Sequence, residues 1–159
     1  MEDKQILNLT TEQEQVINDL ITDFFQHLDI NGEFDLMINE SSVDVVLDTP
    51  DTGIVIGYHG EILDSLQLLL SMIVSKKLGQ FIRLSLEVGD YKKNRAVYLE
   101  NLAEQIKSKV ISENREYTLP SLKPWERRIV HLHLQGDDSV STESIGDGKE
   151  RTLVIRPKA

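Results

Sequence analysis

The sequence contains no cysteine, which excludes disulfide bonds, thiolate ligands and cysteine nucleophiles. Its four histidines are scattered along the chain, so we expect neither a metal nor another cofactor. No apolar run reaches the roughly 18 residues that a membrane-spanning helix needs. The start, Met1-Glu2-Asp3-Lys4, lacks the basic and then apolar pattern of a secretory signal peptide. These absences predict a soluble cytoplasmic protein that does not bind a membrane.

Basic residues are scarce in the first half of the chain. Residues 1–89 hold four lysines and arginines against sixteen acidic residues, whereas residues 90–159 hold thirteen against eleven. The first part therefore has a formal charge of −12 and the second of +2, within a total of −10. This asymmetry indicates two modules with different electrostatic roles, and we place the boundary between them at Gly89-Asp90.

The hydrophobic pattern of the first module predicts a helix followed by a β-hairpin. Thr10 or Thr11 can cap the helix, and Thr11 with Glu14 has the spacing of a capping box. Residues 34–38 and 43–47 then alternate between apolar and polar side chains, as in a hairpin with one buried face.

Gly57-Tyr58-His59-Gly60 is the turn around which the first module is organised. Two glycines three residues apart permit a tight turn that another backbone can approach closely, because neither glycine carries a Cβ. The first amides of the following helix have no partners within the helix and suit a phosphate. A sharp corner between two helices, with no ligand, explains the same spacing, and the pattern alone leaves both interpretations open.

The helix after Gly60 is apolar nearly all round, through about residue 77. Such a helix is expected to be covered on most sides, by a sheet and by another helix. Lys76 and Lys77 end it at the negative end of its dipole. Residues 82–88 alternate again and predict a third strand.

The second module is predicted to contain two helices and three short strands. Its long first helix is amphipathic, with Tyr98 among the side chains expected to face inward. Pro120 ends the first strand, and Pro124 suits the first turn of the next helix because its missing N–H would be unpaired there. The expected order is a helix over 91–114, a strand over 117–119, a helix over 124–134, and strands over 140–144 and 151–155 joined by a turn over 146–148.

Arg127 and His131 lie four residues apart, so they share one face of the predicted helix. Trp125, Ile129 and Leu132 fall on the opposite side, which we expect to be buried. A guanidinium is a rigid donor fork that suits phosphate oxygens, and an imidazole can hydrogen-bond to a base or stack on it. A solvated face whose arginine is held by a nearby carboxylate is the alternative, and the pattern leaves it open.

Several spaced motifs make the chain resemble the bacterial Jag family, also called KhpB or SpoIIIJ-associated proteins. The order of elements around the glycine turn is similar to a type II KH domain. Arg127 and His131 match the spaced arginine and histidine after which the R-three-H domain is named. The motifs are Leu63-Asp64-Ser65-Leu66-Gln67, Tyr91-Lys92-Lys93-Asn94-Arg95, Leu119-Pro120, Glu126-Arg127-Arg128-Ile129-Val130-His131, and Thr142-Glu143-Ser144-Ile145-Gly146 with the later Arg151 and Pro157.

The resemblance implies an α+β fold of two small domains. Residues 1–89 would form a type II-like KH domain, a three-stranded sheet with helices on one face. Residues 90–159 would form an R-three-H domain, helices on a small three-stranded sheet.

The resemblance also implies a cytoplasmic protein that binds single-stranded RNA, or single-stranded DNA, and is not an enzyme. Such a protein would be a regulator or RNA chaperone linked to cell elongation, cell division and cell shape, with a small KH-only protein as its partner. The oligomeric state is not implied. The residues implied to contact RNA are Gly57, Tyr58, His59, Gly60, Arg127, Arg128 and His131, with Lys92, Lys93, Arg95 and Arg151 in support.

The sequence departs from the family in its glycine turn and in its charge. The central positions of related turns usually include a lysine or arginine, whereas here they are Tyr58 and His59. An anionic first module with no permanent cation in its turn is expected to bind RNA weakly. For the whole chain we expect micromolar or weaker affinity for single-stranded RNA. The additional N-terminal domain and long linker of many relatives are not expected here, so functions of that part are not carried over.

A protein–protein adaptor is the second hypothesis, in which the acidic first module docks another KH protein or a ribosomal surface. An enzyme is the third, and the sequence offers little for it. His131 and His133 diverge on a helix. Glu143 and Ser144 supply a carboxylate and a nucleophile, but no spacing places a base beside them.

Overall fold

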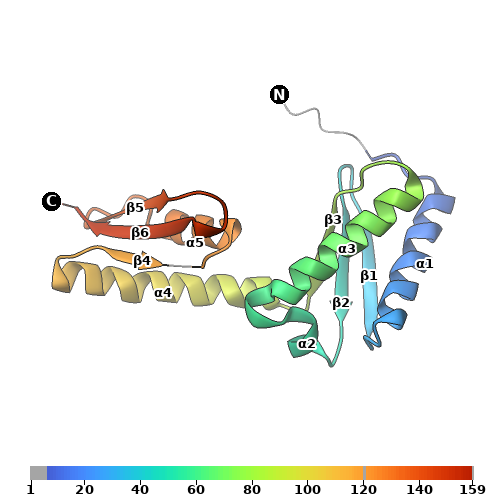
Figure 1. The fold of residues 1–159 in the computed structure, drawn as a ribbon, viewed down its shortest axis with the longest axis horizontal. Helices are drawn as coiled ribbons and strands as arrows, with labels where there is room; N and C mark the ends of the chain where they lie inside the picture. Colours follow the sequence, from blue (N-terminus) through green and yellow to red (C-terminus); the bar gives the residue numbers. More distant parts are fainter. Residues whose placement is uncertain (1–6, 120, 159) are drawn as a thin grey trace. The chain divides into compact units, whose positions relative to one another are not determined.

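The computed structural model describes residues 7–119 and 121–158, so the chain start and the predicted stop at Pro120 lie outside the described residues. The chain divides into two compact units between Tyr91 and Lys92, two residues after the sequence-based boundary. Each unit combines helices with its own three-stranded sheet (Figure 1), which confirms the predicted α+β class. No helix within the described ranges is long and apolar enough to cross a membrane.

The first unit packs its helices on one face of the sheet β1-β2-β3 (Figure 1). Strand β1 pairs antiparallel with β2, and β3 runs parallel to β2 at the edge. Alternate side chains of β2 and β3, such as Val45 and Leu86, are buried beneath the helices, as the alternating pattern predicted. The elements are α1 (Thr11–His27), β1 (Glu33–Ile38), β2 (Val43–Asp48), α2 (Thr52–Ile56), the single 3₁₀ turn η1 (Tyr58–Gly60), α3 (Glu61–Leu78) and β3 (Leu84–Val88).

The capping box of α1 begins one residue earlier than predicted. The Thr10 hydroxyl accepts a hydrogen bond from the Gln13 backbone N–H at 3.2 Å, and the Gln13 side-chain oxygen accepts one from the Thr10 N–H at 3.0 Å. The predicted box of Thr11 with Glu14 is wrong because Thr10 has the extended backbone of an N-cap, whereas Thr11 is already helical.

Helix α3 contacts the sheet and the helix α1, but its outer face is exposed. Leu63, Leu66 and Leu70 are buried against the sheet, but Leu68 is 62% exposed and Met72 is 59% exposed. The predicted cover by a sheet and by another helix is present, but the prediction that it extends over most sides of α3 is wrong for the described residues. We call the exposed set the α3 apolar stripe; it consists of Ile62, Leu68, Leu69, Met72 and Ile73.

The second unit shares one core among α4, α5 and the sheet β4-β6-β5. Both pairings in this sheet are antiparallel, and β6 lies in the middle (Figure 1). Pro124 is the first residue of α5, as predicted. The elements are α4 (Tyr91–Glu113), β4 (Tyr117–Leu119), α5 (Pro124–Leu134), β5 (Val140–Ile145), the 3₁₀ turn η2 (Gly148–Glu150) and β6 (Thr152–Pro157).

Two expectations about inward faces in this unit are wrong. Tyr98 is 54% exposed, so it stands at the surface of α4, where the Arg95 guanidinium lies 5.1 Å from the centre of its ring. On α5, Glu126, Val130 and Leu134 form the buried face. The predicted stripe of Trp125, Ile129 and Leu132 lies at its flank, with Leu132 exposed, because the sheet approaches α5 from the side of Val130.

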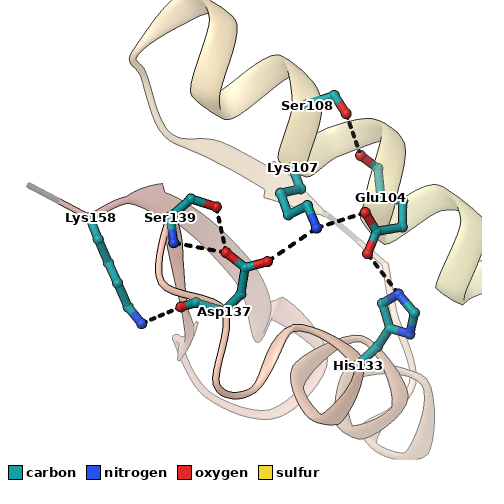
Figure 2. A network of polar contacts seen from close by, with 7 residues as sticks. All are labelled: Glu104, Lys107, Ser108, His133, Asp137, Ser139 and Lys158. Carbon is teal, nitrogen blue, oxygen red and sulfur yellow. Dashed lines mark hydrogen bonds and ion pairs between the residues drawn. The ribbon is translucent and has the colours of Figure 1, made fainter.

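A network of polar contacts joins α4 to the segment between α5 and β5 (Figure 2). The Lys107 ammonium lies 2.8 Å from Glu104 Oε2 and 3.1 Å from Asp137 Oδ2. Glu104 Oε1 lies 3.0 Å from His133 Nε2. Asp137 Oδ1 accepts hydrogen bonds from the Ser139 backbone N–H, at 2.8 Å, and from the Ser139 hydroxyl. The network therefore fastens the end of α5 and the start of β5 to α4.

Replacing Asp137 with asparagine is expected to make stability less dependent on pH in acid. The hydrogen bonds from Ser139, and then the one from Lys107, hold the pKa of Asp137 well below its ordinary value. The ionised carboxylate therefore stabilises the fold above its unfolded pKa of about 4, and this contribution is lost as the pH falls toward the folded pKa. Asp137→Asn should be less stable than the parent at pH 7, and the difference should shrink below about pH 4.

Urea unfolding from pH 7 down to pH 2 measures this difference. Asp138→Asn is the matched control, because it removes the same charge at the exposed neighbouring position. Parallel stability–pH curves for Asp137→Asn and the parent would contradict the assignment.

Candidate nucleic-acid interface

A hollow of about 380 Å³ lies between the start of α5 and β5 in the second unit. Its described lining contains three arginines and one histidine but no acidic residue, although the chain as a whole is strongly anionic. We call it the α5 hollow. Its lining residues are Pro124, Arg127, Arg128, His131, Thr142, Ser144 and Arg151. Of the predicted contact residues, the structure therefore brings together Arg127, Arg128, His131 and Arg151.

Arg127 is anchored, but not by a carboxylate. Its Nη1 donates to the Leu122 carbonyl at 2.7 Å and to the Arg151 carbonyl at 3.4 Å. Carbonyl oxygens satisfy N–H groups without neutralising the cation, so the positive charge of Arg127 stays available to an anion in the hollow. The alternative of an arginine held by a carboxylate does not describe this position. The same bonds make Arg127 a structural clamp between the segment before α5 and the segment before β6.

His131 is oriented by a residue that the sequence analysis did not select. Its Nδ1 lies 2.6 Å from the Thr142 hydroxyl on β5. This contact fixes the ring and leaves Nε2 as the nitrogen available to a ligand. Thr142 and Ser144 alternate along one face of β5, and this spacing is the signal that could have identified them as hollow-lining residues.

The arrangement does not form a catalytic triad. Ser144 lines the same hollow as His131. However, the Thr142 hydroxyl occupies the Nδ1 position, where a triad has its orienting carboxylate. His133 turns away to Glu104 on α4, so the two histidines diverge as predicted.

The supporting residues predicted near the boundary, Lys92, Lys93 and Arg95, do not line the hollow. Arg95 is largely buried, and its Nε lies 2.8 Å from Oε1 of Glu126. Glu126 itself is completely buried, and its Oε2 accepts a hydrogen bond from the Lys123 backbone N–H at 2.8 Å. Arg95 therefore belongs to a structural ion pair, and we leave it out of the proposed interface. Glu126 lies three residues after the N-cap Lys123, which is the spacing of a capping box. This spacing is the sequence signal that could have predicted a structural role for Glu126.

The glycine corner between α2 and α3 has a left-handed backbone at several positions. Gly57, His59 and Gly60 have φ values of 67°, 48° and 76°. A Cβ on Gly57 would lie 2.5 Å from Cγ1 of Ile62, so glycine is required there by packing as well as by conformation. Tyr58 is 74% exposed, and the centre of its ring lies 4.0 Å from that of His59.

Replacing Gly57 with alanine is expected to lower the free energy of unfolding by about 1–3 kcal/mol. Its φ of 67° with ψ of −166° is a conformation that is essentially restricted to glycine. Gly53→Ala is the matched control, because Gly53 lies in α2 and an added Cβ there would meet no described atom within 4 Å. This control should raise the free energy of unfolding by about 0.4–1 kcal/mol. Thermal unfolding followed by circular dichroism measures both changes, and equal stability of the two variants would contradict the packing argument.

The electrostatic surroundings of the glycine corner differ from those of the α5 hollow. Glu61 and Asp64 lie in the first turn of α3, at the positive end of the helix dipole. Asp51 precedes α2 on the other side of the corner. The corner therefore offers backbone amides and two aromatic rings, and the charged residues that flank it along the chain are acidic.

Two family models match the chain in succession. Residues 14–88 match the KH domain of KhpA and KhpB, and residues 97–157 match the R-three-H domain. Both matches agree with the order of the two units in the structure.

Curated relatives share both parts. An RNA-binding protein KhpB of Clostridium symbiosum is 39% identical over 131 residues, which cover 82% of this chain and 58% of the relative. The RNA-binding protein KhpB of Streptococcus pneumoniae serotype 2 is 28% identical over 150 residues, which cover 94% of this chain and 44% of the relative. The RNA-binding protein KhpB of Bacillus subtilis is 27% identical over 133 residues, which cover 81% of this chain and 64% of the relative. The chain thus spans about half the length of these relatives.

Proposed function

The chain belongs to the Jag (KhpB) family, with a KH domain followed by an R-three-H domain, and we propose that it is a cytoplasmic protein that binds single-stranded RNA. The α5 hollow carries this proposal. Its three arginines and one histidine converge without an acidic neighbour in the described lining, in a chain whose net charge is −10. Phosphate is the ligand that such a donor set fits best, because charge-assisted bonds from guanidinium groups to phosphate are strong.

Arg128 and Arg151 are the principal phosphate contacts in this proposal, since both are exposed and line the hollow. Arg127 adds charge from its clamped position, and His131 adds a ring nitrogen. We propose a flexible strand with splayed bases as the ligand, because such strands can place a nucleotide in a surface hollow. Lys92 and Lys93 give additional positive charge. The glycine corner, Gly57 to Gly60, guides the strand through its amides and through the rings of Tyr58 and His59.

Fluorescence anisotropy of the full chain with labelled single-stranded and duplex RNA tests the proposal. We expect micromolar or weaker affinity for the single strand. The log–log salt slope should be about −0.7 for each phosphate contact between roughly 50 and 200 mM salt. Single-stranded DNA of the same sequence shows whether the sugar matters. No binding at low salt, or an equal preference for the duplex, would overturn the proposal.

The broader role in this proposal is that of a regulator or RNA chaperone linked to cell elongation and division. Sequencing of RNA crosslinked to the protein in cells tests that role.

A second candidate function is pairing with another protein, which the α3 apolar stripe favours. Leu68, Leu69 and Met72 expose large apolar side chains on neighbouring turns of one helix. Contiguous exposed apolar surface of this kind marks protein interaction sites. We propose a small KH-only protein as the occupant.

Replacing Leu69 with lysine places a charge in the middle of the stripe and should abolish pairing with a KH-only protein of the same family. RNA affinity of the full chain should stay unchanged, because the stripe does not include the α5 hollow. Analytical ultracentrifugation of the mixture measures pairing. Pairing that survives in the folded variant would remove the stripe as the interface.

A further inference from the structure

The permanent cations of the first unit are concentrated at one end of α3. Within residues 7–91, every lysine and arginine lies between positions 76 and 83, namely Lys76, Lys77 and Arg83. All three are exposed. The same range contains fifteen acidic residues, yet none of those that the structure describes forms an ion pair with these three side chains. Their charge is therefore open to an external anion.

An exposed aromatic ring lies in the same short stretch of chain as these cations. Phe81 is 71% exposed, in the segment that leads from α3 into β3. This segment is fixed, because the N–H of Ile82 donates to the Ser75 hydroxyl at 2.9 Å and its carbonyl accepts from the Ser71 hydroxyl at 2.9 Å. The Ile82 side chain is completely buried. Because successive side chains of an extended segment point to opposite sides, its neighbours Phe81 and Arg83 are both turned to the outside.

Helix stabilisation explains only part of this arrangement. Lys76 and Lys77 lie in the last turn of α3, where a cation interacts favourably with the helix dipole. Arg83 lies outside the helix, and Phe81 gains little burial, since it is 71% exposed. A basic surface with a rigidly held aromatic ring is the composition that single-stranded nucleic acid prefers, because bases stack on the ring while cations contact the phosphates.

We propose that Lys76, Lys77, Phe81 and Arg83 form a second contact site for single-stranded RNA, which we call the α3-end patch. One base stacks on Phe81, and the three cations contact the phosphates beside it. The patch lies at the opposite end of α3 from the glycine corner, about 27 Å away for a helix of 18 residues. This inference rests on the proposed function. It places the strongest attraction of the first unit for RNA at this patch and not at the acidic surroundings of Glu61.

Anisotropy titration of the full chain with single-stranded RNA tests the patch. Phe81→Ala should weaken binding about 5- to 100-fold, because stacking of a base on an aromatic ring has that effect. Phe81→Tyr keeps the ring and should restore the affinity, whereas Phe81→Leu keeps only the apolar character and should not. The triple variant Lys76→Gln, Lys77→Gln, Arg83→Gln should reduce the magnitude of the log–log salt slope by about 2.

Two comparisons make the result specific. Lys109→Gln with Lys149→Gln removes exposed charge elsewhere and should leave the slope nearly unchanged. Tyr58→Ala with His59→Ala should weaken binding less than Phe81→Ala does. If the parent binds RNA and the folded patch variants bind it equally well, the inference is overturned while the proposed function stands. If Phe81→Leu binds like the parent, stacking is excluded. A parent chain that binds no RNA overturns both.

Discussion

Single-stranded RNA binding should fall about 100-fold when Arg128 and Arg151 are both replaced by glutamine. Hydrogen bonds to charged groups are worth about 1.5–3 kcal/mol, which corresponds to roughly tenfold or more for each residue. Both arginines line the α5 hollow with exposed side chains. Starting from micromolar affinity, the double variant should therefore show no measurable binding at moderate salt.

These two positions separate ligand binding from folding better than Arg127 does. Arg127→Ala would also remove the bonds to the carbonyls of Leu122 and Arg151, so a loss of affinity could come from a displaced α5. The paired control is Lys109→Gln with Lys149→Gln, which makes the same change in net charge outside the hollow. Equal affinity of the Arg128/Arg151 variant and the control would exclude the hollow as the site.

The elements of the fold could be predicted because their signals are local. The alternation through Val43, Val45 and Leu47 sets one face of β2 toward the core whatever lies above it. Proline at position 124 marks the start of α5 in the same way. What covers α3 is not a local property. An apolar surface on Leu68 and Met72 can be buried by the same chain or by a partner, and only the packed structure shows that these side chains are exposed.

The candidate site could be predicted only as far as a single helix defines it. Arg127 and His131 share a face of α5 by spacing alone, whereas Thr142 joins them through the docking of β5. The two arginines Arg95 and Arg128 show the same limit. Both belong to basic motifs in the sequence, but Arg95 pairs with a buried carboxylate 31 residues away and Arg128 lines an open hollow. The distinction lies in tertiary contacts that no local pattern contains.

The charge distribution gives the two modules different tasks in RNA binding. An anionic body repels a polyanion at long range, so contact requires places where cations are not neutralised by neighbouring carboxylates. The α5 hollow is such a place in the second unit, and the α3-end patch is proposed as one in the first. This arrangement favours a strand that touches few phosphates, which accounts for the expected weak affinity and limits the salt slope to about −0.7 for each of those few contacts.

Glu126→Ala is expected to be the most destabilising single substitution, costing about 3–5 kcal/mol. The Glu126 carboxylate is completely buried, pairs with Arg95 and caps the Lys123 N–H. Removing it leaves a largely buried guanidinium without its partner and a backbone donor without its acceptor. A small domain has only about 5–15 kcal/mol of stability, so the second unit should melt more than about 10 °C earlier.

The only tryptophan, Trp125, adjoins Glu126, so its fluorescence reports the unfolding of this unit during a urea or thermal titration. Glu100→Ala, at an exposed position of α4, is the control and should change stability by less than about 0.5 kcal/mol.

The double variant Arg95→Met, Glu126→Leu should be far more stable than the sum of the two single losses predicts, because no charge is left buried alone. Strict additivity would show that the pair is not coupled. Retained RNA affinity in that double variant would establish Arg95 as a structural residue, whereas lost affinity in a folded double variant would return it to the interface.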